Sequence, residues 1–315
     1  MSSRVAIAAL LVLFAAPARG GTVALTFDDL PVFGRTKPVA DGVAITRKLL
    51  RGLRAHRIPA IGFVNESQLE DDPAGRTALL ARWLDAGMAL GNHTYSHLSL
   101  TTTPVDAYIA DAAKGDVVTR RLDAAHGTSP HWFRYPFLET GSTLAIRDRF
   151  AAWLASDGYR VAPVTMENAD DIFAMVYDED IARHDRRAAR RVRREYLAFS
   201  RRIIPWYRSA ARALLDREPA YVFLLHASRL NADSIGALAA ILHRQHLRAV
   251  TIDTAMTDPA YALPDTYAGA NGDDQLERWA FTQDKDLPWD DLPVPPKAIS
   301  AESARLDAAG AKEPQ

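Results

Sequence analysis

The sequence of 315 residues contains no cysteine. Disulfide bonds, thiolate metal sites, a cysteine nucleophile and a lipid-modified cysteine are therefore excluded. A chain without disulfides depends on its hydrophobic core, and 48% hydrophobic residues are enough for one large core. A single α/β barrel takes roughly 250 residues, so we expect one domain with extensions.

The chain also lacks an excess of charge of either sign. It has 38 basic and 39 acidic residues and a formal net charge of −1. This balance argues against a nucleic acid as the main partner. Arginine is nevertheless crowded within residues 183–212, which we interpret as a solvated helical face. The alternative is an insertion that shapes a substrate groove or contacts an anionic polymer.

Long apolar runs are rare, and the clearest one lies at the N-terminus. Residues 5–16 are all apolar, they follow Arg4, and a small-residue sequence at 16–18 resembles a cleavage site. This pattern predicts a signal peptide over residues 1–20 and an exported protein, periplasmic or secreted. A buried N-terminal helix is the alternative. The run is too short to span a bilayer, so we expect no membrane span.

Apolar patterning predicts strands and helices in alternation from residue 22 to about residue 253. The predicted strands are 22–27, 59–64, 88–90, 131–135, 160–165, 221–225 and 247–252. The predicted helices are 39–56, 76–86, 104–125, 144–156, 180–215 with a break near Pro205, and 234–243. Such alternation is typical of a parallel sheet whose strands are connected by crossover helices.

The positions of the polar residues favour an α/β barrel with about seven strands over a doubly wound open sheet. Six of them directly follow predicted strands: Asp28, Asp29, His93, Arg134, Asp170 and His226. In a barrel these positions meet at the C-terminal rim, where active sites lie. We expect the barrel to occupy residues 21–257.

The C-terminal part of the chain differs in composition from the barrel. Residues 258–296 are rich in Pro, Gly and Asp, with Trp279 and Trp289 as anchors. We expect this segment to be an extension packed on the barrel. Residues 297–315 have little to bury and are predicted to be a disordered tail.

Two histidines and an acidic pair predict a catalytic metal site. His93 and His97 are four residues apart, a spacing that places both on one face of a helix. One carboxylate of Asp28-Asp29 would complete three ligands and leave a position open for water, while its neighbour acts as a base. Zn²⁺ suits this set best, and Co²⁺ or Ni²⁺ would also fit. Taken separately, such histidines are commonly surface or capping residues, and acidic pairs commonly cap helices.

Two further residues fit a hydrolytic site. Arg134 lies before a proline turn, where its guanidinium could pair with a carboxylate and keep it ionised. His226 follows an apolar strand, where it could act as a general acid. The alternatives are a surface arginine beside a turn and a histidine whose hydrogen bonds are satisfied within the core.

In this order the motifs resemble those of the polysaccharide deacetylases, the NodB-homology family or carbohydrate esterase family 4. The resemblance covers about residues 22–253. The matching residues are Thr26-Phe27-Asp28-Asp29, His93-Thr94-Tyr95-Ser96-His97 after Gly91-Asn92, Arg134-Tyr135-Pro136-Phe137, Asp170, and Leu224-Leu225-His226.

The resemblance implies a distorted (β/α)7 barrel of the TIM type and a role for each matching residue. The metal ligands would be Asp29, His93 and His97. The catalytic base would be Asp28, oriented by Arg134, and the general acid would be His226, tuned by Asp170. The backbone N–H of Phe137 would contribute to the oxyanion hole.

The chain departs from the family pattern at two of these motifs. Leu30-Pro31 follows the acidic pair, where the family usually has Gly-Pro. Asp171 follows Asp170, where the family usually has Trp. The choice between Asp170 and Asp171 as the fourth-motif aspartate therefore stays open, with Asp170 favoured.

These observations predict a metal-dependent hydrolase of carbon–nitrogen bonds other than peptide bonds. Its substrate would be an acetylated glycan, an amino-sugar polymer or oligosaccharide such as peptidoglycan or chitin, from which it removes N-acetyl groups. The alternatives are an O-acetyl esterase, a small-amide hydrolase of the same superfamily, and a non-catalytic glycan-binding barrel. A nucleic-acid-binding module built on the arginine-rich helix is disfavoured by the predicted export.

Overall fold

The computed structural model describes residues 20–34, 38–129 and 131–310. The predicted signal peptide, residues 1–20, lies outside this part of the chain except for Gly20. Within the described ranges, no helix combines the length and the apolar character needed to cross a membrane.

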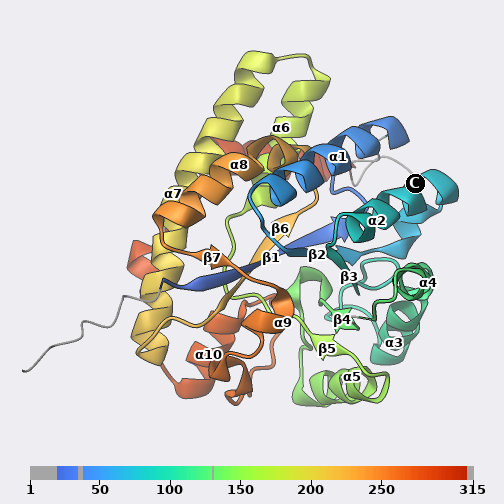
Figure 1. Cartoon of the computed structure of the whole chain (residues 1–315). Helices are drawn as coiled ribbons and strands as arrows, with labels where there is room; N and C mark the ends of the chain where they lie inside the picture. Colours follow the sequence, from blue (N-terminus) through green and yellow to red (C-terminus); the bar gives the residue numbers. More distant parts are fainter. Residues whose placement is uncertain (1–19, 35–37, 130, 311–315) are drawn as a thin grey trace, which may run out of the picture.

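Seven parallel strands form one curled sheet around which the helices pack (Figure 1). The strands are β1 (Thr22–Leu30), β2 (Ala60–Val64), β3 (Ala89–Asn92), β4 (Trp132–Phe133), β5 (Arg160–Val161), β6 (Tyr221–His226) and β7 (Arg248–Ala249). Their order is β5-β4-β3-β2-β1-β6, and β7 pairs with the first two residues of β1. All the ladders are parallel, as the alternation of strands and helices predicts.

The segment after β5 connects the two ends of this strand order. Met166 forms a parallel bridge with Phe223 of β6. The N–H of Thr165 donates to the carbonyl of Val222 at 3.0 Å, and the N–H of Leu224 donates to the carbonyl of Met166 at 3.0 Å. The sheet therefore curls back on itself. The predicted α/β barrel is confirmed, and the doubly wound open sheet is not the fold.

Helices cover the outside of the sheet. They are α1 (Val39–Ala55), α2 (Pro73–Asp85), α3 (Val105–Lys114), α4 (Val117–Ala125), α5 (Leu144–Ser156), α6 (Asp170–Ala182), α7 (Arg186–Leu215), α8 (Arg229–Arg244), α9 (Ile252–Ala255), α10 (Gln275–Gln283) and α11 (Lys297–Gly310). Short 3-10 turns are η1 (Glu66–Leu69), η2 (Pro136–Leu138), η3 (Pro259–Ala262) and η4 (Trp289–Asp291). In Figure 1, α1 lies between α8 and α2, and contacts between these helices join them into one layer.

Strand β1 joins several strands of the barrel, because it pairs with β2, β6 and β7. Val23, Leu25 and Phe27 are buried, and so are the residues between them. Thr26 is the one polar residue within this run, and its hydroxyl donates to the carbonyl of Phe223 at 3.0 Å. In a parallel sheet, an apolar run of this kind favours a strand that is buried on both faces.

The single helix predicted over residues 104–125 is wrong, because the structure has α3 and α4 with a break at Gly115-Asp116. A Cβ on Gly115 would overlap the backbone of Thr94 and Tyr95. The chain therefore turns where it packs against the loop that carries the two histidines. Asp111, near the end of α3, accepts hydrogen bonds from the N–H groups of Tyr95 and Ser96 at 3.1 and 3.0 Å.

The long helical region predicted over 180–215 also differs from the structure. Helix α6 begins earlier, at Asp170, and α7 continues through Pro205 without the predicted break. The neighbours of the proline, Ile204 and Trp206, are both buried, and the indole N–H of Trp206 donates to the carbonyl of Pro288 at 3.0 Å. Packing of this kind can hold a helix together where proline removes one backbone hydrogen bond.

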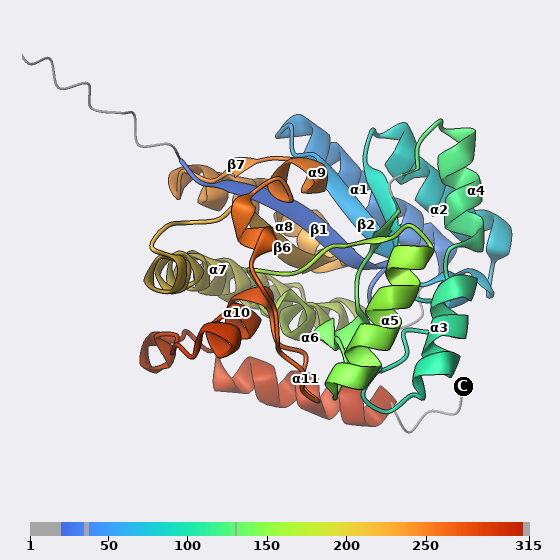
Figure 2. The same ribbon diagram turned by 90° about the horizontal axis from the view of Figure 1, so that it is seen from below.

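The C-terminal part of the chain is more ordered than its composition predicts. Trp279 is buried, whereas Trp289 is 45% exposed and lies against Trp206 with ring centroids 5.8 Å apart. The disorder predicted from residue 297 is wrong for α11, which packs on α6 (Figure 2). Its apolar residues Ile299 and Leu306 are seven residues apart and buried on one helical face, a short pattern that is easily missed in a polar segment.

Replacing Gly115 with alanine should destabilise the protein by about 1–3 kcal/mol, since the added methyl group has backbone atoms in its way. Gly236→Ala in α8 is the matched control. Its Cβ would meet only the end of the exposed His56 ring, 3.1 Å away, and alanine favours the helix by up to about 1 kcal/mol. Urea unfolding of both variants measures the two effects. Equal changes in both would contradict the packing described here.

Candidate active site

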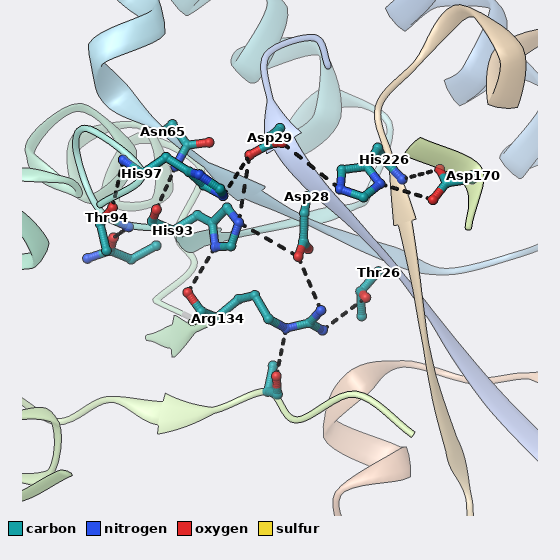
Figure 3. Close-up of polar contacts among 12 residues, drawn as sticks. Thr26, Asp28, Asp29, Asn65, His93, Thr94, His97, Arg134, Asp170 and His226 are labelled. Carbon is teal, nitrogen blue, oxygen red and sulfur yellow. Dashed lines mark hydrogen bonds and ion pairs between the residues drawn. The ribbon is translucent and has the colours of Figure 1, made fainter. Parts of the chain in front are cut away.

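The carboxyl ends of β1, β3, β4 and β6 meet at one rim of the barrel, around a cavity of 270 Å³ (Figure 3). The structure brings together there the residues that the sequence predicts for the site: Asp28, Asp29, His93, His97, Arg134, Phe137, Asp170 and His226. Asp28, Asp29 and His226 are at the carboxyl ends of β1 and β6, Asp170 begins α6, and the others come from the segments that follow β3 and β4, so all lie at the rim expected for a parallel barrel.

Asp29, His93 and His97 form a group that could hold a metal ion. Asp29 Oδ1 lies 3.5 Å from His97 Nε2 and 3.7 Å from His93 Nε2. Two ligand atoms that are each roughly 2.1 Å from a tetrahedral cation lie roughly 3.4 Å apart. The separations therefore fit a small divalent cation, and two imidazoles with one carboxylate are a donor set that binds such cations.

The two histidines lie on a loop and not on a helix, so the helical interpretation of their spacing is wrong. Thr94 and His97 both have positive φ angles, 64° and 55°. The side chain of Asn92 accepts a hydrogen bond from Thr94 N at 2.7 Å, and the hydroxyl of Thr94 accepts one from His97 N at 3.0 Å. A compact turn held by these side chains brings both rings to the same side.

Hydrogen bonding sets the tautomer of His93. Its Nδ1 lies 2.9 Å from the carbonyl oxygen of Arg134, which can only accept. Nδ1 therefore carries the hydrogen, and the lone pair of Nε2 faces Asp29. Burial, followed by the nearby His97, lowers the pKa of His93 well below its usual value. The ring is thus neutral, as a metal ligand must be.

Arg134 is buried and forms an ion pair with Asp28. Its Nη1 lies 3.3 Å from Asp28 Oδ2, its Nη2 donates to the Thr26 hydroxyl at 3.0 Å, and its Nε donates to the carbonyl of Ala162 at 2.7 Å. Burial raises the pKa of Asp28 to about 6, although Arg134 acts in the opposite direction. Asp28 Oδ1 is buried and has no hydrogen-bond partner, so one oxygen of this carboxylate is left to act on a ligand.

His226 is held by Asp170. Its Nδ1 lies 3.0 Å from Asp170 Oδ1, and its backbone N–H donates to Asp170 Oδ2 at 2.7 Å. Burial alone would lower the pKa of His226, but the Asp170 carboxylate outweighs it, with smaller effects of Asp29 and Asp171, and raises this pKa to about 10. Nε2 faces the cavity, 4.0 Å from Asp29 Oδ2. Asp170 is therefore the partner of His226, and both Asp170 and Asp171 line the cavity.

Phe137 lies at the mouth of the cavity in a left-handed conformation, with φ of 54°. Its ring is 54% exposed and packs edge-on against His97, with centroids 4.4 Å apart. Gly272, from the C-terminal segment, lies so close that a Cβ there would overlap the Phe137 carbonyl oxygen. The turn that orients the Phe137 amide is thus supported by a residue more than a hundred positions away.

Some residues of the site carry no signal of their own in the sequence. Asn231 donates to Asp170 Oδ2 at 2.5 Å, and to the carbonyl of His226 at 2.9 Å. Phe33 packs on the His226 ring with centroids 4.5 Å apart. Glu167 lines the cavity, and burial together with Asp274 and Asp171 raises its pKa well above the usual range. The sequence could indicate these three residues only by their closeness to the motifs, since each lies within five residues of a motif residue.

Comparison with known proteins supports the resemblance drawn from the motifs. The family model described as polysaccharide deacetylase matches residues 15–162. A peptidoglycan-N-acetylglucosamine deacetylase of Bacillus cereus is 27% identical over 157 residues, which cover 50% of this chain and 49% of the relative. The chain therefore spans about half the length of the curated relative that it matches.

Solved structures show the same fold. A polysaccharide deacetylase of Bacillus cereus aligns with a TM-score of 0.50 and 18% identity, over 74% of this chain and 94% of that one. A mutant of a carbohydrate esterase family 4 pseudoenzyme aligns with a TM-score of 0.50 and 17% identity, over 75% and 67%. Together with the family model, these matches confirm the polysaccharide deacetylase resemblance predicted from the motifs.

Binding of Zn²⁺ to chelator-treated protein should raise its melting temperature, because an ion that binds only the folded state stabilises it. His97→Gln should weaken this binding by at least about 10- to 100-fold, since one of three ligands is lost. His126→Gln is the control, because His126 is exposed and contacts Asp85 at 3.2 Å and the carbonyl of Leu122 at 2.8 Å, not the candidate ligands. Calorimetry and elemental analysis measure affinity and stoichiometry. Unchanged binding in His97→Gln would rule out this ligand set.

Proposed function

We propose that this chain, a relative of the polysaccharide deacetylases, is a metal-dependent hydrolase that removes N-acetyl groups from an amino-sugar polymer or oligosaccharide. One observation carries the proposal. The candidate metal group of Asp29, His93 and His97 shares a 270 Å³ cavity with an arginine-paired carboxylate and an aspartate-paired histidine. A site with separate groups for taking and giving a proton is what amide hydrolysis needs.

We further propose Zn²⁺ as the bound ion, since two imidazoles and one carboxylate suit it, while Co²⁺ or Ni²⁺ would also fit. Asp29, His93 and His97 would hold it. When bound, such an ion supplies Lewis-acid polarisation of a carbonyl oxygen and lowers the pKa of water.

Asp28 is the proposed base. Its Oδ2 lies 3.8 Å from His93 Nε2, so the carboxylate is next to the candidate ligands without being one of the three. Arg134 holds one carboxylate oxygen, and the other is buried without a partner. A carboxylate in this state can accept a proton from a water molecule placed beside it, and the guanidinium keeps it ionised before the reaction.

His226 is the proposed acid. Asp170 accepts from its Nδ1, which favours the protonated ring, and Nε2 is left facing the cavity. The leaving group of an acetamide is an amine, which departs only when it is protonated. Asp170 and Asn231 act by positioning this ring. The Phe137 N–H would stabilise the developing oxyanion, a contribution on the order of 3 kcal/mol for one such donor in other enzymes.

Composition and the curated relative support a glycan substrate outside the cytoplasm. The apolar run at residues 5–16 after Arg4 fits an export signal, and the relative is by name a deacetylase of N-acetylglucosamine in peptidoglycan. We therefore propose an exported enzyme whose barrel, residues 21–257, acts on peptidoglycan or a chitin-like glycan. Residues 258–296 would be its extension.

Asp28→Asn should lower the rate of acetate release by about 10²- to 10⁴-fold, and His226→Gln by a similar factor, because each removes a proton-transfer group. Both variants should keep the metal, since neither removes one of the three ligands. Asp85→Asn, a change of an exposed acid, should have the activity of the wild type. Acetate is measured with acetylated chitooligosaccharides, peptidoglycan fragments and acetylxylan.

The choice of substrates decides between the possible functions. Release from the N-acetylated glycans and not from acetylxylan supports the deacetylase, and the reverse identifies an O-acetyl esterase. No release from any of them, with the metal bound, would contradict a hydrolase of acetylated glycans. Full activity of Asp28→Asn would contradict the proposed base.

A further inference from the structure

A second cavity adjoins the reaction cavity. It has a volume of 530 Å³, and the two share Asp29, Phe33, His97 and Asp171 as lining residues. We call it the side groove. Because the two cavities share these residues, a chain molecule whose reacting group lies at the candidate metal group would have a neighbouring unit beside the side groove.

Three helical elements contribute to the walls of the side groove, beside the end of β1 with the segment after it and the loop that carries His97. Ser67 and Gln68 belong to η1, Asp171 to the first turn of α6, and Asp307 to α11. Helix α11 packs on α6, so the last described helix of the chain is placed beside the site. Asp307 is exposed, whereas Ser303, one turn earlier on the same helix, is buried.

The groove offers hydrogen-bond acceptors and negative charge. Among the described residues that line it there is no lysine or arginine. Asp171 and Asp307 contribute carboxylates in addition to Asp29, which belongs to the candidate metal group. In the polysaccharide deacetylases the position of Asp171 is usually tryptophan, so this chain has a carboxylate in place of an aromatic ring.

Asn65 points independently to a ligand. It lines the groove, it is only 2% exposed, and its Oδ1 has no hydrogen-bond partner. Its Nδ2 donates to the carbonyl of His93 at 2.5 Å, so the amide cannot turn round without losing that bond (Figure 3). A buried acceptor without a partner is costly, and a donor on a ligand would relieve the cost.

We propose that the side groove binds a sugar neighbouring the one that reacts, and that it prefers a neighbour with a free, protonated amino group. This inference rests on the proposed deacetylase function and specifies its substrate class. An ammonium group supplies three donors and one positive charge, which match an amide oxygen and carboxylates. An N-acetyl group has one N–H and no charge, and a sugar acid would be repelled.

Defined tetrasaccharides test the preference. The substrates are the fully N-acetylated glucosamine tetramer, the same tetramer with one free amino group, and a tetramer that contains a carboxylated sugar. We expect the highest kcat/KM for the tetramer with the free amine and the lowest for the acidic one. The difference should shrink at 0.5 M NaCl, since part of the groove is open to solvent and such charges are screened.

Single substitutions locate the effect. Asp307→Asn and Asp171→Asn should each reduce the preference by about two- to fivefold, the usual range for a partly exposed charge pair. Asp216→Asn is the matched control. It removes the same charge at the end of α7, close to the start of β6 and thus on the side of the sheet away from the site. Asparagine also suits the left-handed conformation of residue 216.

Direct binding separates this inference from the proposed function. Calorimetry should show that the fully deacetylated tetramer binds the metal-loaded wild type more tightly than the acetylated one, and that Asp307→Asn weakens only the former. If this binding pattern is found but no acetate is released, the deacetylase function is overturned, whereas the proposed preference of the groove for an amino group stands. Equal affinities for the two tetramers, or equal preferences in Asp307→Asn and Asp216→Asn, would overturn the inference even in an active enzyme.

Discussion

The site depends on one buried arginine. Arg134 is 1% exposed, and a guanidinium in such a position is tolerated only when its N–H groups have polar partners. Its side chain contacts Asp28, Thr26 and the carbonyl of Ala162, and its own carbonyl receives the Nδ1 hydrogen of His93. A single residue thereby sets the position of the proposed base and the tautomer of one candidate ligand, and it ties β1 to the ends of β4 and β5, which are not its neighbours in the sheet.

The charges around this arginine are consistent with the proposed cation site. Asp28, Asp29, Asp170, Asp171 and Glu167 line one small cavity, and Arg134 and His226 are the cationic groups near them. Burial and the neighbouring carboxylates raise the pKa of Asp28 and of Glu167, so that both acids bind protons more readily than they would in water. A divalent ion would reverse that tendency and restore the carboxylates to the ionised state.

Much of the fold and of the site could be predicted from the sequence, because both follow from the ends of parallel strands. Asp28 and His226 are register partners on adjacent strands, so a polar residue after each apolar run places the two together. Loop shape and packing could not be predicted in this way. The His93–His97 spacing indicated a helix, but hydrogen bonds from Asn92 and Thr94 produce a turn instead. Contacts between distant segments, such as α11 on α6, have no local signature.

The contact of Gly272 with the Phe137 carbonyl has a consequence for the order in which the molecule can mature. All the residues proposed to carry out the reaction lie between Asp28 and His226, yet the turn at Phe137 is buttressed by a segment that leaves the ribosome later. A nascent chain that ends between His226 and Gly272 would therefore contain all of these residues, but its turn at Phe137 would lack the supporting contact. The turn at Phe137 would reach its final form only after the segment around Gly272 has been synthesised and has packed against it.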